Sequence, residues 1–366
     1  MAERITAITM PKWGMAMDEG TVVVWHVPEG TSVAEGQEVV DVESPKIANA
    51  IEAKRAGVLR RQVAPLGSVL PVGGLIGVIA DSDVPDPEID AFVAGFEPPE
   101  TAEADSGPAI ATIEANGRNI AYLDIGAGDP PILLVHGFGG SLASFMFNQS
   151  SLAEDRRVIA IDLPGHGASS KDVGDGSAAS LAQAVNAAID ALGLTRFHLV
   201  GHSLGGAICL HLARLRPAQV ASVTLIASAG LGPEIDGAFI DAFVTAERRK
   251  EMTEVATKLY ANQSIVTRRV VEDMLRMKRI DGASKAMTTI AAQQFPGGRQ
   301  RIAEPADSGI PLQVIWGDAD RVIPVAHAAL ASGAQRHIVA GVGHMVHAEA
   351  HAEVNRAIAG FCNAHS

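Results

Sequence analysis

The sequence predicts a multidomain protein in which a small all-β barrel or sandwich precedes an α/β domain that carries a helical insertion. Three observations predict this fold class. The first 80 residues repeat a pattern at a displacement of 37 positions, an acidic segment follows, and from about residue 109 apolar strand patterns alternate with helical ones. With 366 residues, 47% of them hydrophobic, the chain is long enough for one small core and one large core.

Residues 1–80 contain two copies of one pattern. Glycines and apolar residues keep the same register in both copies, as six pairs show: Gly20 with Gly57, Gly30 with Gly67, Gly36 with Gly73, Val22 with Leu59, Val33 with Leu70, and Val39 with Ile76. Short Val-rich runs broken by Gly and Pro, such as 21–25 and 38–42, are typical of strands. Neither copy can bury a core alone, so we expect the two copies to pack face to face.

Lys46 lies where the first copy gives way to the second. A shift of 37 positions from Lys46 reaches Thr9 or Asp83, at the two ends of the domain, so the internal symmetry predicts that Lys46 projects from the opposite end. Pro45 favours a turn there, because its ring presets φ and it cannot continue a strand ladder. An ordinary exposed lysine is the alternative. The position between the repeats favours an attachment site.

Residues 81–108 form an acidic, proline-containing linker. From 81 to 107 there are nine Asp and Glu residues and no Lys or Arg. This composition predicts an extended, self-repelling tether. The apolar positions of 89–96 are compatible with a short amphipathic helix, which we expect to be transient.

Residues 109–366 form the larger domain, in which apolar runs alternate with helical patterns. The predicted strands are 110–114, 120–124, 132–135, 158–161, 197–200, 220–227, 312–316 and 337–340, and the predicted helices include 178–192, 205–215, 326–331 and 349–361. Near-continuous apolar strands that alternate with helices indicate a mostly parallel sheet covered on both faces.

Ser203 lies in the strongest local motif of the chain, Gly201-His-Ser-Leu-Gly205, between a predicted strand and a predicted helix. A serine held in a sharp strand-to-helix turn needs neighbours without side chains so that the two elements can approach each other. The turn also places the serine at a helix N-terminus, where backbone amides favour a developing anion. The motif therefore predicts that Ser203 is a nucleophile for acyl transfer.

The other parts of such a site follow neighbouring strands. The glycine-rich turn 136–140 follows a strand, and the backbone N–H groups of Phe138 and Leu204 are expected to form an oxyanion hole. Asp320 and His344 each follow a later strand. The chain order Ser, Asp, His is that of α/β-hydrolases.

Each assignment has an alternative. Asp318 lies in the same loop as Asp320, but directly after Gly317 it suits a turn-forming role. His347 and His351 follow His344 closely, and we expect them to be surface histidines. His202 and His166 lie at the same sheet edge, where we expect structural roles.

With these motifs, residues 109–366 resemble the α/β-hydrolase superfamily over their whole length. The resemblance implies that Ser203, Asp320 and His344 are nucleophile, acid and base. It also implies that the helical stretch 231–298 is a cap domain. The cap holds eleven Lys and Arg residues, counting Arg299 at its edge, against nine acids, so it is mildly basic in an acidic chain. Such a surface suits a nucleotide-like phosphate or is simply solvated.

Residues 1–80 resemble a lipoyl domain of the 2-oxoacid dehydrogenase complexes. The resemblance rests on the run 10–20, on Gly57, on the tip 43–47 and on several further positions, namely Trp25, Glu29, Gly30 and Gly36. It implies that Lys46 carries lipoate in amide linkage, although Pro45 stands where the family usually has an acid. A biotin-carrier domain has the same architecture but usually flanks its lysine with methionines. Lys54, beyond the tip, is the weaker attachment site.

The combination of the two domains resembles the acyltransferase components of bacterial acetoin dehydrogenase complexes. The resemblance implies transfer of an acetyl group from the lipoyl arm on Lys46 to coenzyme A. It also implies two partners, a thiamine-diphosphate acetoin-cleaving component and a flavin-dependent dihydrolipoamide dehydrogenase, and we expect an oligomer. Two alternatives stay open: a serine hydrolase or thioesterase that transfers the acyl group to water, and a lipoyl carrier whose second domain serves assembly only.

Composition limits the other function classes. The formal charge of −13 argues against nucleic acid as a partner. The two cysteines, Cys209 and Cys362, form no metal or disulfide pattern, so no metal site is predicted and a reducing compartment is expected. No stretch has the pattern of a signal peptide or a membrane span, and a cytoplasmic location is the expectation.

Overall fold

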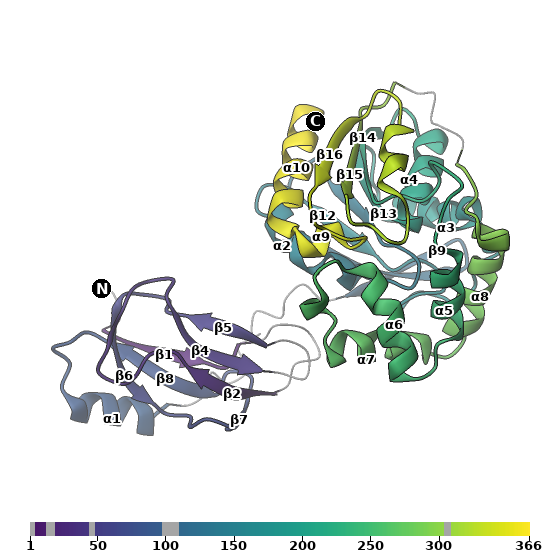
Figure 1. Ribbon diagram of the computed structural model, residues 1–366. Helices are drawn as coiled ribbons and strands as arrows, with labels where there is room; N and C mark the ends of the chain where they lie inside the picture. Colours follow the sequence, from purple (N-terminus) through teal and green to yellow (C-terminus); the bar gives the residue numbers. More distant parts are fainter. Residues whose placement is uncertain (1–3, 12–18, 44–47, 97–109, 304–308) are drawn as a thin grey trace. The chain divides into compact units, whose positions relative to one another are not determined.

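The computed structural model describes residues 4–11, 19–43, 48–96, 110–303 and 309–366. The chain divides into two compact units, residues 1–109 and residues 110–366 (Figure 1). Each unit has its own hydrophobic core.

The first unit contains two four-stranded sheets in which all neighbouring strands are antiparallel. In spatial order one sheet holds β1 (Ile5–Thr9), β8 (Leu75–Ala80), β6 (Gly57–Gln62) and β3 (Ser32–Val33), and the other holds β5 (Ala48–Glu52), β4 (Glu38–Glu43), β2 (Glu19–Trp25) and β7 (Val69–Pro71). Repeat-related residues of both sheets, including Val22, Leu59 and Ile76, are buried in a single cluster. The two copies therefore form one core, as the symmetry predicts.

The repeated glycines have a conformational reason. Gly30 and Gly67 both have φ of 82°, and Gly36 and Gly73 have φ of 78° and 82°. Side chains with a Cβ rarely adopt such angles, so both copies need glycine at the same turns.

The hairpin of β4 and β5 flanks the predicted attachment lysine. Its two strands are antiparallel, and Glu43 is paired with Ala48. Residues 44–47, which include Lys46, lie outside the described residues.

The start of the predicted linker is folded, which differs from the expectation of an extended tether from residue 81. A helix, α1 (Asp86–Ala94), follows β8. Its fully buried Ile89 packs in a cluster with Val78 and Ala80 of β8. Arg60 and Arg61 of β6 form ion pairs with acids of α1, at 2.6 Å to Asp86 and 2.8 Å to Asp90. The acids of this segment thus find cationic partners in the first unit instead of repelling one another.

The second unit is built on an eight-stranded sheet. In spatial order the strands are β16 (Gln335–Val339), β15 (Leu312–Gly317), β14 (Val220–Ile226), β13 (Phe197–His202), β11 (Ile132–Val135), β12 (Val158–Ile161), β10 (Arg118–Ile125) and β9 (Ala111–Ala115). The strands from β16 to β12 are parallel, and β10 and β9 complete the sheet as antiparallel strands. The predicted mostly parallel sheet is confirmed.

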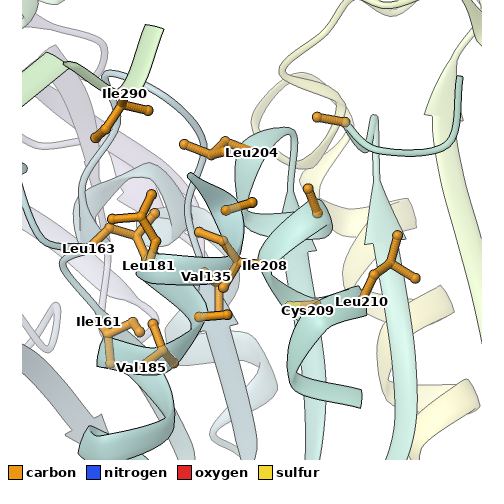
Figure 2. Packing of buried hydrophobic residues seen from close by; sticks show 14 of the residues in the cluster. Val135, Ile161, Leu163, Leu181, Val185, Leu204, Ile208, Cys209, Leu210 and Ile290 are labelled. Atoms are coloured by element: carbon orange, nitrogen blue, oxygen red, sulfur yellow. The ribbon is translucent and has the colours of Figure 1, made fainter. Parts of the chain in front are cut away.

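Helices cover both faces of this sheet. Alternate residues of β11 enter different clusters: Leu133 and Val135 pack with α3 (Ala178–Ala191) and α4 (Leu204–Leu215), whereas Ile132 and Leu134 pack with α2 (Met146–Leu152) and α10 (His351–Ala364). Figure 2 shows the first face, where Val135 lies close to Ile208 of α4.

Two predicted helices differ in detail. The segment predicted as helix 326–331 is a 3₁₀ turn, η4 (Val325–Ala329). The predicted helix 349–361 is divided into α9 (Val346–Glu349) and α10, because the backbone at Ala350 is not helical. A second 3₁₀ turn, η1 (Leu142–Phe145), precedes α2.

A helical cap is inserted between β14 and β15. It consists of α5 (Gly237–Thr245), α6 (Arg249–Leu259), α7 (Arg268–Lys278) and α8 (Ala283–Gln294), with the 3₁₀ turns η2 (Gln263–Ile265) and η3 (Pro296–Gly298) (Figure 1). Phe243, Val255 and Ile290 of the cap join the cluster that covers one face of the sheet, so the cap is continuous with the main core. Among the helices of the described ranges, none has both the length and the apolar character that crossing a bilayer requires.

Candidate active site

Ser203 occupies a strained turn between β13 and α4. Its φ of 51° and ψ of −118° lie in a region that residues with a side chain rarely adopt. Hydrogen bonds on both sides hold it there: its N–H donates to the carbonyl oxygen of Ile226, and its own carbonyl oxygen accepts from Gly206 and Ala229, each at 2.9 Å. This is the backbone geometry of a nucleophile elbow.

The glycines around Ser203 are required by close packing. A Cβ at Gly201 would approach the backbone of Gly205 and lie 2.7 Å from Sγ of Cys209, and a Cβ at Gly205 would lie 2.7 Å from the carbonyl oxygen of His136. Both distances are too short for real Cβ contacts. The strand and the helix can therefore meet at Ser203 only because both positions lack a side chain.

Asp320 and His344 are brought together by the ends of β15 and β16. Nδ1 of His344 lies 2.8 Å from Oδ2 of Asp320, and both side chains are buried. Oδ2 of Asp320 also accepts from Nε1 of Trp316, and Oδ1 accepts from the N–H groups of Val322 and Ile323. These four contacts fix the carboxylate, which in turn orients the imidazole ring.

Asp318, the alternative acid, does not reach His344. Its side chain is exposed, and its Oδ1 accepts a hydrogen bond of 2.6 Å from the N–H of Gly341. This contact joins the loop after β15 to the loop after β16.

His202 connects the strand before Ser203 with the loop of His344. Its Nε2 lies 3.1 Å from the carbonyl oxygen of His344, and the two rings are 4.9 Å apart between centroids. Burial lowers the pKa of His202 well below its ordinary value, so the ring is neutral and donates through Nε2. In its structural role, His202 therefore joins the turn of Ser203 to the loop of His344.

The predicted oxyanion turn passes directly over Ser203. A Cβ at Gly137 would lie 3.0 Å from Cβ of Ser203, which shows how closely the turn and the elbow approach. Phe138 is the next residue in the turn. Leu204 is the first residue of α4, so its N–H has no acceptor within the helix. Both predicted donors therefore belong to backbone that adjoins Ser203.

Two buried histidines hold this turn. The N–H of Gly139 donates to Nε2 of His166 at 3.1 Å, and Nε2 of His136 accepts from Leu163 at 3.0 Å. Burial lowers the pKa of His136 to about 4 and that of His166 to about 3. Both rings therefore stay neutral acceptors at neutral pH, and the expected structural role of His166 is that of a support for the oxyanion turn.

His347 was expected at the surface, and this prediction is wrong. Its ring is fully buried, 4.4 Å from the centroid of His202 and 4.9 Å from that of Phe145. Burial lowers its pKa to about 3. The reason is that α9 turns Val346 and His347 inward before α10 begins. His351 is exposed, as expected, and stacks on Phe147.

An aromatic wall from the cap covers the oxyanion turn. The ring of Phe138 packs against Phe243 at 5.3 Å and against Phe295 at 5.8 Å between centroids. Nζ of the buried Lys278 donates to the carbonyl oxygens of Phe243 and Val244, at 2.7 and 3.0 Å. Lys278 thereby caps the end of α5. Sequence reasoning missed this wall, because its members have no fixed spacing from the motifs.

The end of α6 is fastened to the loops of both Asp320 and His344. The carboxylate of Glu349 accepts from Gly343 at 2.8 Å, from Ala261 at 3.0 Å and from Asn262 at 2.8 Å. Arg321, next to Asp320, donates to the carbonyl oxygen of Tyr260 at 2.9 Å. Sequence patterns gave no signal for either contact, since each joins segments about 60 to 90 residues apart.

The two cysteine thiols are not accessible as nucleophiles. Cys209 and Cys362 are buried, and burial raises the pKa of Cys362 to about 12 and that of Cys209 further still. Within the described ranges, no cluster of His, Cys, Asp and Glu side chains could hold a metal ion.

Comparisons with known proteins agree with both folds. Residues 130–350 match the α/β-hydrolase fold family, and residues 6–79 match the biotin/lipoyl family, described as biotin-requiring enzyme. A solved meta-cleavage product hydrolase from Pseudomonas fluorescens has a TM-score of 0.64 at 23% identity, covering 70% of this chain and 99% of its own. At that identity the likeness shows the fold alone.

Two relatives extend over nearly the whole chain. A protein of Pseudomonas putida is 42% identical over 99% of this chain and 100% of its own length, and one of Cupriavidus necator is 42% identical over 93% of each. Both are named as the dihydrolipoyllysine-residue acetyltransferase component of an acetoin cleaving system. The chain, a biotin/lipoyl domain joined to an α/β-hydrolase domain, therefore belongs to the family of these acetyltransferase components.

Proposed function

We propose that the protein transfers an acetyl group from a dihydrolipoyl arm on Lys46 to coenzyme A, with Ser203 as the covalent relay. The observation that carries the proposal is the strained Ser203, whose turn is joined through His202 to the loop of the buried His344–Asp320 pair, in a chain that resembles acetyltransferase components over its whole length. A domain that served assembly only would need neither the strain nor the buried pair.

The described residues fit a lipoyl group on Lys46. The hairpin of β4 and β5 is paired up to Glu43 and Ala48, and the four residues between them include Lys46. Lys54 follows β5 and is not between these paired strands. When bound, the lipoyl group supplies the acetyl thioester; the remaining steps belong to the hydrolase unit.

In the first half-reaction, Asp320 accepts the Nδ1 proton of His344 in a hydrogen bond, which leaves Nε2 to take the proton of Ser203. Oγ of Ser203 attacks the thioester carbonyl, and the N–H groups of Phe138 and Leu204 stabilise the oxyanion. The C–S bond breaks, His344 returns its proton to the departing sulfur, and the acetyl group is left on Ser203.

In the second half-reaction, His344 takes the proton of the coenzyme A thiol, and the thiolate attacks the acetyl-serine. The C–O bond to Ser203 breaks, and the same proton passes to Oγ. Acetyl-coenzyme A leaves and Ser203 is restored, so no oxidant or further reactant is needed.

The names of the relatives support a place in a multienzyme system. A thiamine-diphosphate component that cleaves acetoin would load the arm, and a flavin-dependent dihydrolipoamide dehydrogenase would reoxidise it. We further propose an oligomer that works in the cytoplasm. We propose that residues 1–80 are the lipoyl domain and residues 109–366 the hydrolase domain. The helix α1 belongs with the lipoyl domain.

A second candidate is a hydrolase in which water accepts the acetyl group. Curated relatives of the second domain favour it, since they include 2-hydroxy-6-oxononadienedioate/2-hydroxy-6-oxononatrienedioate hydrolases that are 30% identical over 56% of this chain. The test is to assay the lipoylated protein with acetyl-dihydrolipoamide, with and without coenzyme A. Acetyl-coenzyme A formed at the expense of free acetate supports transfer, whereas acetate release unchanged by coenzyme A contradicts it.

The attachment site has its own test. Lys46→Arg should show no lipoyl adduct by intact mass, and an adduct on that variant would contradict the attachment site.

A further inference from the structure

A groove on the outer side of the cap is lined by arginines. It has a volume of about 390 Å³ and lies between the start of α6 and one face of α7, with Arg249, Glu272, Leu275, Arg276 and Arg279 as its lining. Three residues of α7 and Arg279, which directly follows the helix, have the spacing of a single helix face. The volume lies within the range of small-molecule sites.

The groove is positive in an otherwise acidic chain. Three guanidinium groups face one carboxylate, that of Glu272, while the whole chain has a formal charge of −13. Arg249 lies 4.0 Å from Glu272, and Arg276 pairs with Asp273 at 2.9 Å. Among the described residues, no carboxylate forms an ion pair with Arg279. The pKa of Glu272 is lowered, first by its hydrogen bond with Arg268 and then by the charges of Arg268, Arg249 and Arg276.

The same helix that carries these arginines supports the active site. Lys278 is adjacent to Arg279 and holds the end of α5, where Phe243 packs on Phe138. Leu275 of the groove is buried in the main core. The outer face of α7 therefore offers cations while its inner face supports the wall over the oxyanion turn.

We propose that this groove binds the phosphate-bearing end of the thiol acceptor. The inference rests on the proposed function and adds the part of the molecule that recognises coenzyme A. Arginine forks match phosphate oxygens in bidentate hydrogen bonds. The pantetheine arm separates the phosphates of coenzyme A from its thiol, so phosphates and reacting sulfur can bind at different places. A protein surface is a poorer occupant, because a stable protein interface buries about 800 Å² per partner.

The experiment compares thiol acceptors with and without phosphates. In the full-length lipoylated protein, Arg276→Gln combined with Arg279→Gln should raise KM for coenzyme A about tenfold or more, since two charge-assisted hydrogen bonds are lost. We expect kcat to stay within about twofold and transfer to pantetheine, which has no phosphate, to be unchanged. Both arginines are exposed, so the fold should be kept, which circular dichroism checks.

Two matched variants sharpen the result. Lys285→Gln removes one positive charge from an exposed position of α8 outside the groove and should leave KM unchanged. Glu272→Gln removes the one carboxylate of the groove and should lower KM. An unchanged KM in the double variant, an equal effect of Lys285→Gln, or an equal loss with pantetheine would each overturn the proposal.

A binding measurement separates this inference from the proposed function. Calorimetry with adenosine 3′,5′-bisphosphate tests the groove even if the protein transfers acetyl groups only to water. Binding to the parent protein that is lost in the double variant and weaker with inorganic phosphate supports a nucleotide-phosphate site. Absence of binding to the folded parent protein contradicts it.

Discussion

At the scale of single residues, the feature that stands out is the backbone strain at Ser203. Its φ of 51° is held by hydrogen bonds with three residues, from α4 and from the end of β14. Residues in such regions cost on the order of 1–3 kcal/mol each and are retained where function requires the geometry. The strain is therefore consistent with the role of nucleophile proposed for Ser203.

Two substitutions at Ser203 test this interpretation. Ser203→Ala should lower acetyl transfer by several orders of magnitude, because it removes the nucleophile and leaves the fold. Ser203→Gly should be equally inactive but more stable, by roughly 1 kcal/mol, because glycine adopts this backbone conformation without strain. Steady-state rates and urea denaturation check the two effects.

The opposite pattern would identify another mechanism. If the thiol of coenzyme A attacked the lipoyl thioester directly, His344→Ala would be severe and Ser203→Ala mild, because a thiol needs a base but no serine. A serine-directed phosphonate that labels Ser203 and blocks transfer supports the covalent route.

The two acids of the β15 loop give a matched pair. Asp320→Asn should reduce kcat by about 10⁴, because an amide at this place favours the wrong tautomer of His344. Asp318→Asn keeps an acceptor for Gly341 and should leave kcat near that of the parent protein. Equal losses for both variants would contradict the assignment of the acid.

At the scale of elements, α1 shows what local sequence patterns miss. The segment is rich in acids, and its own residues indicate repulsion. Its partners Arg60 and Arg61 lie 26 and 29 positions upstream of the acids that they bind. A pattern within α1 cannot contain this information. The strands of the parallel sheet were predictable for the opposite reason. A continuous apolar run indicates a buried strand from its own residues alone.

Limited proteolysis should reflect the folded α1. A Glu-specific protease should spare Glu88 and cut first after Glu97, Glu100 or Glu103, which belong to the acidic remainder of the linker. Ile89→Asp places a charge in the cluster beneath α1 and should open cleavage at Glu88. Mass spectrometry of the first fragments distinguishes the sites. Early cleavage at Glu88 in the parent protein would show that α1 is not held.

The site shows the same division. The turn at Ser203 and the places of Asp320 and His344 after their strands were predictable, because strand, turn and motif are adjacent in the sequence. His347, Lys278 and Glu349 were not, because their partners come from segments far away in the chain. Burial of a histidine depends on which way a short helix faces, and α9 is too short to show a period.

At the scale of the whole molecule, buried histidines set the response to acid. Burial lowers the pKa of His136 and His198 to about 4 and of His166 and His347 to about 3, against an ordinary value of 6.5. Below pH 6.5 the unfolded chain binds protons at these rings while the folded protein does not. The contribution of these neutral rings to the free energy of unfolding is therefore fully present above pH 6.5 and is lost as the pH drops toward 4. Each unit by which a pKa is lowered corresponds to about 1.4 kcal/mol.

His347→Phe tests this dependence at one position. The phenyl ring keeps the contact with Phe145 but cannot titrate, so stability should fall less steeply between pH 6.5 and pH 5 than in the parent protein. His351→Phe changes an exposed ring and should leave the slope unchanged. Urea denaturation of the second unit at several pH values measures the slopes. An identical slope in both variants would contradict the argument.

The burial of both cysteines has a consequence for the chemical setting proposed here. The proposed reaction uses dihydrolipoyl and coenzyme A thiols, and oxidised forms of either would exchange with an accessible protein thiolate. Cys209 and Cys362 offer none, because burial suppresses the thiolate and denies access. The folded protein therefore does not form mixed disulfides with oxidised lipoyl groups or oxidised coenzyme A. A thiol reagent should modify the cysteines only at the rate at which the second unit unfolds.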